Sequence, residues 1–428
     1  MNMKELCIKI ISDLQQRGAD KVAVTADVSQ MEELQFEFNE IDLLRSFTET
    51  TLYIKVIKDN KKANISLNQL NEAAISKAMD SVMADAENSQ PDPAYDIAPW
   101  QESGVFHLGP ETADRDRMYF LIDTFKEECS KKYPGLRLEG NITHYYSTQY
   151  YYNSNGVDFQ QTRGGYVYVA MFSAREGKKV SSFNYTYGNY VDLQKSYWDV
   201  SLLQELIEQS VGSLECKPVP ATFTGDVILV PTMVDEFISS LVNTQLTDRM
   251  IITNNSILKG RIGEKVLSEA VNLSSYPTDP DLAGGYFVTG DGFRSEKVDI
   301  FSAGVLQNYL LSHFGSRKTG LPMSKAGGCF VLEPGTDKLA DMIKGIDKGL
   351  LVVRFAGGNP SINGDFSGVA KNSFYIENGK ISYPVNETMI SGNLLEIFKD
   401  VKGVSSDVLN SGNFKMPWVR CGGVTISS

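Results

Sequence analysis

The chain opens with apolar residues at helical spacing and then changes to the alternation typical of strands. Apolar residues between Leu6 and Leu14 recur at the period of an amphipathic helix. Alternation of apolar and polar positions predicts strands over three further stretches, 21–26, 33–38 and 51–57. Asn68 is expected to cap a second helix, whose apolar face runs from Ile75 to Ala86. The first part of the chain is therefore predicted to fold as helix, strands and helix.

The middle of the chain contains a polar connector followed by strands. Residues 88–110 are rich in Pro, Asp, Ser and Gly, which predicts an extended connector. Apolar residues at helical spacing predict a helix over 118–129. Hairpin turns are expected at the Asn-Gly pair 155–156 and the Glu-Gly pair 176–177, because each lies between apolar runs. Residues 217–220, Lys-Pro-Val-Pro, resemble a domain linker.

The segment after this linker contains the helix on which the functional interpretation depends. A short apolar run at 227–230 predicts a buried strand. Thr232 and Asp235 then have the spacing of a capping box, and apolar residues from Val234 to Val242 recur at helical spacing. The opposite face of this helix carries only hydroxyls and amides, at Ser239, Ser240, Asn243 and Thr244.

The rest of the second half is expected to consist mostly of strands and turns. One more helix is predicted over 338–346 from the phase of its apolar residues. Glycine is dense in this half, which suits turns and close backbone contacts. The whole pattern predicts an α+β protein of two domains. Residues 1–218 would form a helix and antiparallel-sheet domain with a subdomain break near 88–110, and residues 219–428 a β-rich domain.

Composition and charge exclude several classes of protein. A chain of 428 residues with 42% hydrophobic and 22% charged residues is typical of a globular protein of two or three domains. Its net charge of −12, from 41 basic and 53 acidic residues, argues against a nucleic-acid partner, because phosphate contacts need clustered Lys and Arg. The sequence has no signal peptide and no run of about 20 apolar residues, so we expect no membrane contact and a cytoplasmic location.

No common catalytic pattern is complete in the sequence. The run 364–368, Gly-Asp-Phe-Ser-Gly, departs from the nucleophile elbow G-x-S-x-G, and Gly-Asp-Gly at 290–292 is more typical of a β-turn than of a phosphate loop. The five cysteines form no C-x-x-C pair, and Cys421 is the candidate for a reactive thiol. The three histidines belong to no H-E-x-x-H motif and are expected to be structural or solvated; they are His107, His144 and His313.

Three segments of the chain carry recognisable motifs. The longest is 363–393, NGDFSGVAKNSFYIENGKISYPVNETMISGN, which contains Gly-Asp-Phe-Ser, Ile-Glu-Asn-Gly-Lys, Pro-Val and Gly-Asn. It resembles the signature of the TldD/PmbA family, also called TldD/TldE and formerly described as modulators of DNA gyrase. The run Gly-x-x-Gly-Glu at 260–264 and the turn at 153–156 also match. The resemblance covers nearly the whole chain and implies the two-domain α+β architecture of this family.

The resemblance implies a place in a cytoplasmic zinc metallopeptidase system that acts on unfolded or modified peptides as a two-subunit assembly. TldD-type subunits carry a His-Glu-x-x-x-His helix and a later Cys as zinc ligands, whereas TldE-type (PmbA-type) subunits lack them. Counted without gaps, these positions fall at Ser239, Ser240, Thr244 and near Ser411. Neutral hydroxyls are poor zinc ligands, although the same hydroxyls are also common on any solvent-facing helix. The chain is therefore expected to be a TldE-type subunit without a zinc ion of its own.

Three interpretations remain open at this point. The chain can be a non-catalytic subunit that shapes a peptide-binding cavity, either as a homodimer or beside a TldD-type partner that holds the zinc. It can instead be a self-sufficient peptidase with an unrecognised site, using Cys421 or Glu264, or a peptide-binding or regulatory module with no enzyme partner. The candidate peptide contacts are loop residues that are equally typical of turns, namely Gly357, Gly358, Asn359, Asn363 and Asp365.

Overall fold

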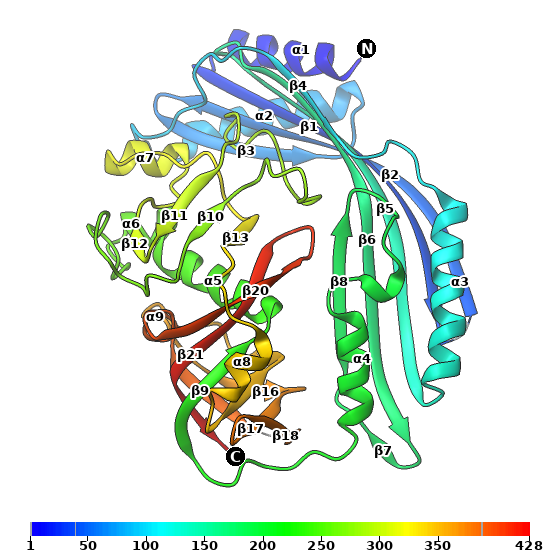
Figure 1. Ribbon diagram of the computed structural model, residues 1–428. Coiled ribbons are helices and arrows are strands. Elements are labelled where there is room, and N and C mark those ends of the chain that lie inside the picture. The colour runs from blue at the N-terminus through cyan, green and yellow to red at the C-terminus, as the bar shows by residue number, and fades with distance from the viewer. Residues whose placement is uncertain (1, 39, 387) are drawn as a thin grey trace.

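The strands of the protein form two sheets, each with its own set of helices. The computed structural model describes residues 2–38, 40–386 and 388–428, so Met1, Asn39 and Glu387 of the 363–393 motif lie outside the described residues. Within these ranges one sheet has eight strands and the other has thirteen. Figure 1 shows the first sheet, in blue to green, arching over and beside the second half of the chain. The predicted α+β fold is confirmed.

The first sheet has the strand order β3-β2-β1-β5-β6-β4, and β7 and β8 also pair with β6. Its neighbouring strands are antiparallel except for β4 and β6, which are parallel. The strands are β1 (Lys21–Glu37), β2 (Glu40–Lys58), β3 (Lys61–Leu67), β4 (Gly104–Leu108), β5 (Leu136–Asn153), β6 (Asp158–Glu176), β7 (Lys179–Val180) and β8 (Asn184–Tyr190). The helices are α1 (Met3–Gln16), α2 (Glu72–Asn88), α3 (Arg115–Lys132), η1 (Tyr197–Asp199) and α4 (Leu203–Gly212).

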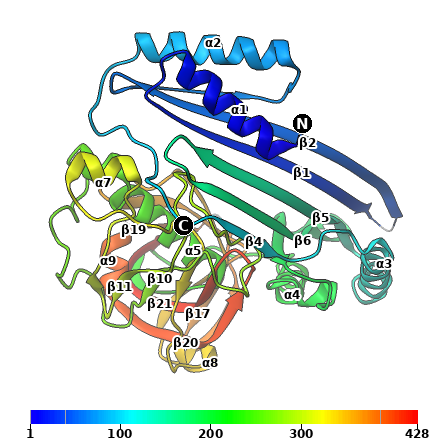
Figure 2. The ribbon, with the colours of Figure 1, turned by 90° about the horizontal axis from the view of Figure 1, so that it is seen from above.

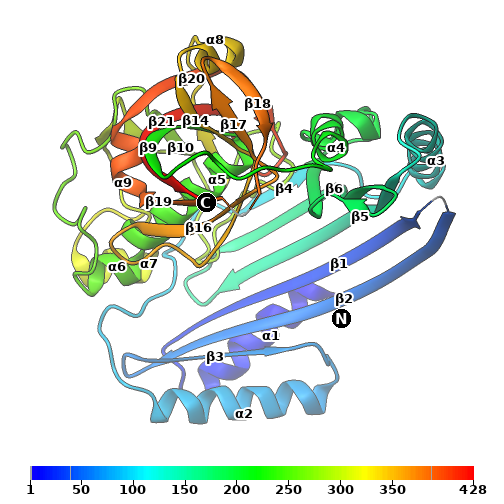
Figure 3. The same ribbon diagram turned by 90° about the horizontal axis from the view of Figure 1, so that it is seen from below.

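Helices cover one face of the first sheet, and the second half of the chain packs on the other face. Successive strand residues point to opposite faces. Even-numbered residues of β1 pack under α1 and α2 near Val22 and under α3 and η1 near Phe36. Figures 2 and 3 show α1 and α2 together over β1, β2 and β3. On the other face, the hydroxyls of Tyr145 and Tyr151 each donate at 3.1 Å to backbone carbonyls of the second half.

The second sheet is mixed and contains the strands from β9 onward. Its main path is β12-β11-β10-β13-β21-β9-β14-β17-β18, with β15, β16, β19 and β20 attached beside it. The strands are β9 (Phe223–Leu229), β10 (Leu273–Ser275), β11 (Val298–Ser302), β12 (Val305–Leu306), β13 (Phe330–Leu332), β14 (Lys348–Val352), β15 (Arg354–Gly357), β16 (Asp365–Lys371), β17 (Phe374–Glu377), β18 (Lys380–Pro384), β19 (Met389–Asn393), β20 (Val401–Asn410) and β21 (Lys415–Ser427). The helices are α5 (Pro231–Gln245), α6 (Asp248–Ile252), α7 (His313–Thr319), α8 (Leu339–Lys344) and α9 (Leu394–Lys399).

The helix α5 is fixed by a buried aromatic cluster. It follows β9, which pairs in parallel with β14 and antiparallel with β21. Phe237 of α5 meets the rings of Phe355 and Phe366, with centroids 5.7 and 4.9 Å apart. Aromatic packing of this kind buries a large apolar area with defined geometry. The opposite, polar face of α5 is therefore held away from the core.

A loop from the second half is bound directly to the first sheet. The side-chain oxygen of Gln161 accepts hydrogen bonds from the backbone N–H groups of Phe287 at 2.9 Å and Val288 at 3.1 Å. Arg163 donates to the carbonyl of Gly285 at 2.7 Å. Gln161 is buried, so loss of these bonds would leave polar groups unsatisfied. The position of the loop at 286–291 therefore depends on β6.

Several predicted boundaries were wrong for reasons that the structure explains. The strands predicted over 21–26 and 33–38 are one strand, β1, because the polar residues between them also pair with both neighbours. Asn71, not Asn68, caps α2. The connector at 88–110 contains β4. The second half also contains the short helices α6, α7 and α9, of five to seven residues, which were not predicted.

Other local predictions were confirmed. Hairpins are present at both predicted places, with Gly156 at φ 86° and Gly177 at φ 59°; in the second, Glu176 still pairs with Lys179 and the turn is 177–178. These positive values suit glycine, which has no Cβ to clash with the backbone. The helix predicted over 338–346 is α8. Among the described residues, no helix combines the length and the apolar character that crossing a membrane would require.

Candidate functional site

The helix α5 begins directly after β9, at Pro231. Its N-cap residue is Val230 and no side chain caps the helix, so the predicted capping box of Thr232 and Asp235 is wrong. Proline suits the first helical position because its φ is already near the helical value and the missing N–H would have no helical partner there. The polar face is as predicted, half-buried or exposed, and consists of Ser239, Ser240, Asn243 and Thr244.

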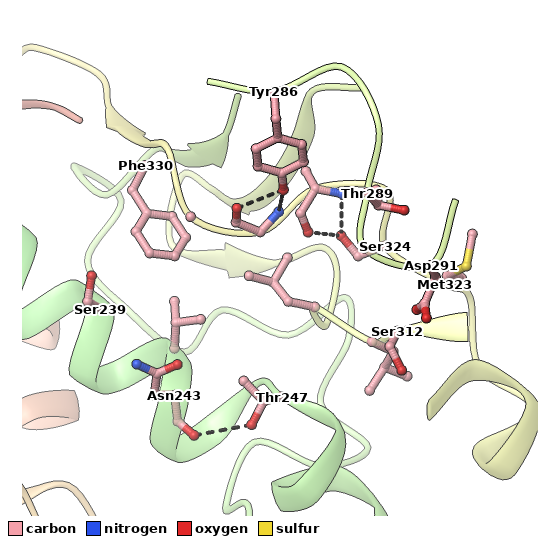
Figure 4. Close-up of a pocket in the computed structure, with 17 residues that line it drawn as sticks. Ser239, Asn243, Thr247, Tyr286, Thr289, Asp291, Ser312, Met323, Ser324 and Phe330 are labelled. Atoms are coloured by element: carbon pink, nitrogen blue, oxygen red, sulfur yellow. Dashed lines mark hydrogen bonds between the residues drawn. The ribbon is translucent and has the colours of Figure 1, made fainter. Parts of the chain in front are cut away.

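A cavity of about 530 Å³ lies beside the polar face of α5. Ser239 and Asn243, one helical turn apart, form one wall, as Figure 4 shows. The other walls come from residues 286–291, 310–312 and 323–330. These walls contain apolar side chains, hydroxyl groups and the backbone of glycine residues. Such a mixture, apolar walls with a few polar groups, is typical of ligand-binding sites.

Polar groups on the wall opposite α5 are already engaged. The Tyr286 hydroxyl donates to the carbonyl of Gly327 and accepts from its N–H, each at 2.8 Å (Figure 4). Burial raises the pKa of Tyr286 to about 12, so its phenol remains protonated at neutral pH. Ser324 donates to a backbone carbonyl of its own turn at 2.7 Å. The side chains of Ser239 and Asn243, in contrast, form no hydrogen bond with the described residues and are available to a ligand.

Among the residues that line the cavity, Asp291 carries a carboxylate. One oxygen accepts the backbone N–H of His313 at 3.0 Å, and the other lies 3.5 Å from the ammonium of Lys55 on β2. The N–H of Gly292 donates to the carbonyl of Thr289 at 2.9 Å, and Gly292 has φ 81°. The β-turn predicted at 290–292 is therefore confirmed. The turn directs Asp291 toward the first sheet, where Lys55 balances its charge.

The four residues at the positions that the resemblance assigned to zinc ligands do not suit a zinc ion. Ser239 lines the cavity, but Ser240 and Thr244 do not, and the Thr244 hydroxyl donates to the Ser240 carbonyl at 2.8 Å. Ser411 is buried, and its hydroxyl accepts backbone N–H groups of its own hairpin at 3.2 and 3.3 Å. The described ranges contain no group of three or more His, Cys, Asp or Glu that could hold an ion. Zinc requires such ligands.

Neither the three histidines nor Cys421 line the cavity beside α5. The Nε2 atom of buried His144 lies 3.1 Å from the carbonyl oxygen of Pro110. His107 is exposed on β4, and His313 begins α7. Cys421 is fully buried, and burial raises the pKa of its thiol far above the ordinary range. A thiolate nucleophile at this position is therefore not supported, because the thiol stays protonated.

The five predicted peptide contacts lie between the end of β15 and the start of β16: Gly357 ends β15, Asp365 begins β16, and the other three lie in the loop between them. None of them lines the cavity beside α5. The side chain of Asn393 donates to the Asn363 carbonyl and to the Asp365 carboxylate, each at 2.8 Å. The buried side chain of Gln245, at the end of α5, donates to the carbonyl of Ile362 at 2.8 Å. These bonds give the loop a structural role at the end of α5, and its role in binding peptide stays a prediction.

Most of the residues that line the cavity were not predicted from the sequence. Tyr286, Thr289, Ser312 and Ser324 lie in loops without a periodic pattern, and they approach α5 only in the folded chain. The density of glycine near Gly327 was the available signal, because glycine allows close backbone approach. That signal indicated turns but not which turns meet.

Comparison with known proteins gives these features a family context. Residues 222–428 match the model of the PmbA/TldA metallopeptidase C-terminal domain. The chain is 24% identical to the metalloprotease PmbA of Escherichia coli O157:H7, over 91% of this chain and 87% of that protein. It is 23% identical to a metalloprotease PmbA homologue of Haemophilus influenzae, over 93% of this chain and 90% of that protein.

Solved structures share the fold over nearly the whole chain. A candidate modulator of DNA gyrase from Bacteroides thetaiotaomicron has a TM-score of 0.88 at 22% identity, covering 99% of this chain and 98% of that chain. TldE from Thermococcus kodakarensis has a TM-score of 0.85 at 19% identity, covering 99% of this chain and 100% of that chain. At these identities the likeness shows a common fold.

Proposed function

The chain belongs to the PmbA/TldD family, and on that basis we propose that it is a PmbA-type, or TldE-type, subunit of a metallopeptidase system that binds peptide beside α5. Its relatives are named metalloproteases, and one structural neighbour is named TldE. In this proposal the subunit contributes binding surface and leaves the chemistry of hydrolysis to another chain.

One observation carries the proposal. The α5 positions that the resemblance assigns to the zinc ligands of a TldD-type subunit carry the hydroxyls of Ser239, Ser240 and Thr244. Of these, Ser239 borders the cavity, together with the amide of Asn243. Hydroxyl and amide groups form hydrogen bonds but are poor zinc ligands beside imidazole, thiolate or carboxylate. Zinc lowers the pKa of a bound water to about 7, and without it the cavity holds no comparable nucleophile. We therefore infer that the cavity binds and orients a substrate rather than cleaving it.

The chemistry of the cavity suits an extended peptide. A peptide in this conformation presents alternate side chains and an unpaired backbone N–H and C=O at each residue. Leu310 and Phe330 offer apolar surface for side chains, while Ser239 and Asn243 offer donors and acceptors for the backbone. Unfolded or modified peptides expose these groups, whereas folded proteins bury them. The loop residues from Gly357 to Asp365 would extend the same surface past the end of α5.

A dimer completes the proposed system. The chain would act as a homodimer or beside a TldD-type subunit that supplies the zinc, in the cytoplasm, without a nucleic-acid or membrane partner. The net charge of −12 supports the absence of a nucleic-acid partner. A self-sufficient peptidase is less well supported, because Cys421 is buried and the carboxylate of Glu264 is paired with Arg261 at 2.8 Å.

Digestion of an unfolded protein tests the division of labour. We expect the purified chain to leave casein intact with or without added zinc. Mixed with a TldD-type subunit carrying the His-Glu-x-x-x-His helix, it should give peptide products that a chelator abolishes. Products detected by mass spectrometry from the chain alone, lost on chelation, would contradict the proposal.

A matched pair of substitutions tests the cavity itself. Ser239→Phe places a ring in the cavity, whereas Ser240→Phe places the same ring on the neighbouring helix position outside the lining. We expect Ser239→Phe to weaken binding of a fluorescent unfolded peptide by about tenfold or more, which is about 1.4 kcal/mol. Ser240→Phe should bind as the wild type does. Equal effects of the two substitutions would place the peptide elsewhere.

A further inference from the structure

Part of the outer edge of β2 has no neighbouring strand. β2 pairs with β1 from Glu40 to Ile57, with one bulge at Asp42, but β3 pairs only with residues 52–58. Within the described chain, residues 40–51 have no strand on their outer side, and no other described segment forms a backbone hydrogen bond with them. Figure 3 shows this part of β2 continuing past β3 along the margin of the sheet. A row of unpaired N–H and C=O groups is therefore open.

Residues 43–51 of the open segment carry exposed apolar side chains, and the bulge of β2 lies before them, at Asp42. Leu44 is 59% exposed and Phe47 is 44% exposed. Protected edges in natural proteins are short, or carry Lys, Pro or a bulge that discourages pairing. Residues 43–51, Leu-Leu-Arg-Ser-Phe-Thr-Glu-Thr-Thr, contain neither Lys nor Pro, and their pairing with β1 shows no bulge. Such an edge is suited to pairing with another strand.

We propose that a second copy of this chain pairs antiparallel with this edge, so that the two first sheets join across a two-fold axis. The inference concerns assembly of this chain and does not depend on the proposed peptidase role. No residue from 40 to 51 lines the cavity beside α5, so the pairing leaves that cavity open.

The geometry of antiparallel strands restricts the register. Side chains that face each other across two strands lie on the same side of the sheet. A two-fold axis perpendicular to a continuous sheet keeps each side chain on the same face of the sheet. Two residues that lie opposite each other are therefore an even number of positions apart, and the residue at the centre lies opposite its own copy. With Phe47 at that position, the pairing spans residues 43–51 and ends where β3 begins to pair, at Leu52. The open segment therefore allows a symmetric pairing centred on Phe47.

Charge favours this register over its neighbours. With Phe47 on the axis, Arg45 of each copy lies opposite Glu49 of the other, which gives two opposite-charge pairs. Centring on Arg45 would place two arginines opposite each other. Centring on Ser46 would place Glu49 opposite Leu43, without any charge pair. In the Phe47 register the two rings meet on the axis between the charge pairs, so the segment is complementary to itself.

Sedimentation equilibrium of the full chain tests the proposal. The wild type should form a species of about twice 47.4 kDa at micromolar concentration. Glu49→Arg replaces both opposite-charge pairs with arginine pairs and should raise the dimer Kd by about tenfold or more. Glu49 lies opposite Ser29 on β1 and has no ion pair within the described chain, so this change should leave the fold intact. Exposed Glu111→Arg is the matched control and should leave the Kd unchanged.

Mixing two variants tests the register. Arg45→Gln avoids placing a second carboxylate beside Glu33, the present partner of Arg45. A mixed dimer of Glu49→Arg and Arg45→Gln has one Arg–Glu pair and no like-charge pair. It should therefore form more tightly than Glu49→Arg with itself. Equal melting temperatures of the variants confirm that each is folded.

Four results would overturn the proposal. The first is a wild type that stays monomeric up to about 100 μM, a range in which specific interfaces are occupied. The second is a dimer whose Kd responds equally to the changes at Glu49 and Glu111, which would place the contact elsewhere. The third is a mixed dimer no tighter than Glu49→Arg alone. The fourth is association only with a TldD-type chain, which would assign the edge to that partner.

Discussion

Replacing Asp235 with Asn should stabilise the protein, and more in mildly alkaline than in mildly acidic solution. Asp235 lies in α5 beside a cavity of about 250 Å³ that also contains Tyr187 of β8 and Arg354 of β15. Burial, and then the charge of Glu236, raises the pKa of Asp235 to about 7. No described residue donates a hydrogen bond to its carboxylate. No hydrogen bond therefore offsets the free-energy cost of ionising the Asp235 carboxylate in this position.

The direction of the effect follows from proton binding. Between the ordinary pKa of 3.8 and about 7, the folded chain holds the proton that the unfolded chain has lost. The free energy of unfolding therefore falls as the pH rises through this window. The pKa difference between 3.8 and about 7 corresponds to a change of about 4 kcal/mol in the free energy of unfolding. Because the side chain is partly exposed and the structure can relax locally, we expect a change of about 2 kcal/mol. Asn has nearly the same shape and no charge to desolvate.

Urea denaturation at about pH 5 and about pH 8 measures this difference. Asp235→Asn should exceed the wild type in stability by about 2 kcal/mol more at the higher pH than at the lower. Asp85→Asn, on the exposed face of α2, is the matched control and should show no such dependence. A gain that is equal at both pH values, or a loss of stability at pH 8, would refute the argument.

Two further substitutions and one thiol-labelling reaction test the packing of the protein. Gly412→Ala should destabilise the protein by more than about 3 kcal/mol in urea, because Gly412 has φ 81° and a Cβ there would lie 1.4 Å from the Asn189 carbonyl oxygen. Gln245→Ala should cost about 2 to 3 kcal/mol and speed proteolysis of the β15–β16 loop, since the buried amide donates to the Ile362 carbonyl at 2.8 Å. Cys421 should react with a maleimide only in denaturant, as peptide mass spectrometry would show, because it is fully buried.

The polar face of α5 was predictable because it depends on local spacing. Ser239 and Asn243 are four residues apart, so they must share a helix face once the apolar positions around them face the core. The helix start was not predicted well, because the Thr232 and Asp235 pattern imitates a capping box while Pro231 sets the true first position. Local patterns thus identified the face and misplaced the end.

The remaining walls of the cavity could not be predicted because their contacts are distant in sequence. Tyr286 and Gly327 exchange two hydrogen bonds across 41 residues, and no period or motif connects them. Gln161 holds the backbone at Phe287 and Val288 across more than 120 residues. The fold class followed from the periods of the strands and helices, whereas the site follows from the pairing of loops that carry no period.

The zinc content of the purified chain, by mass spectrometry of the metal and by titration calorimetry, tests the central claim most directly. Hydroxyls stand at the expected ligand positions Ser239, Ser240 and Thr244, so the chain alone should hold far less than one zinc ion per molecule and show no saturable binding. A TldD-type subunit measured in parallel should bind about one ion through its His-Glu-x-x-x-His helix. One zinc ion per molecule of this chain, released from the cavity by a chelator, would contradict the account.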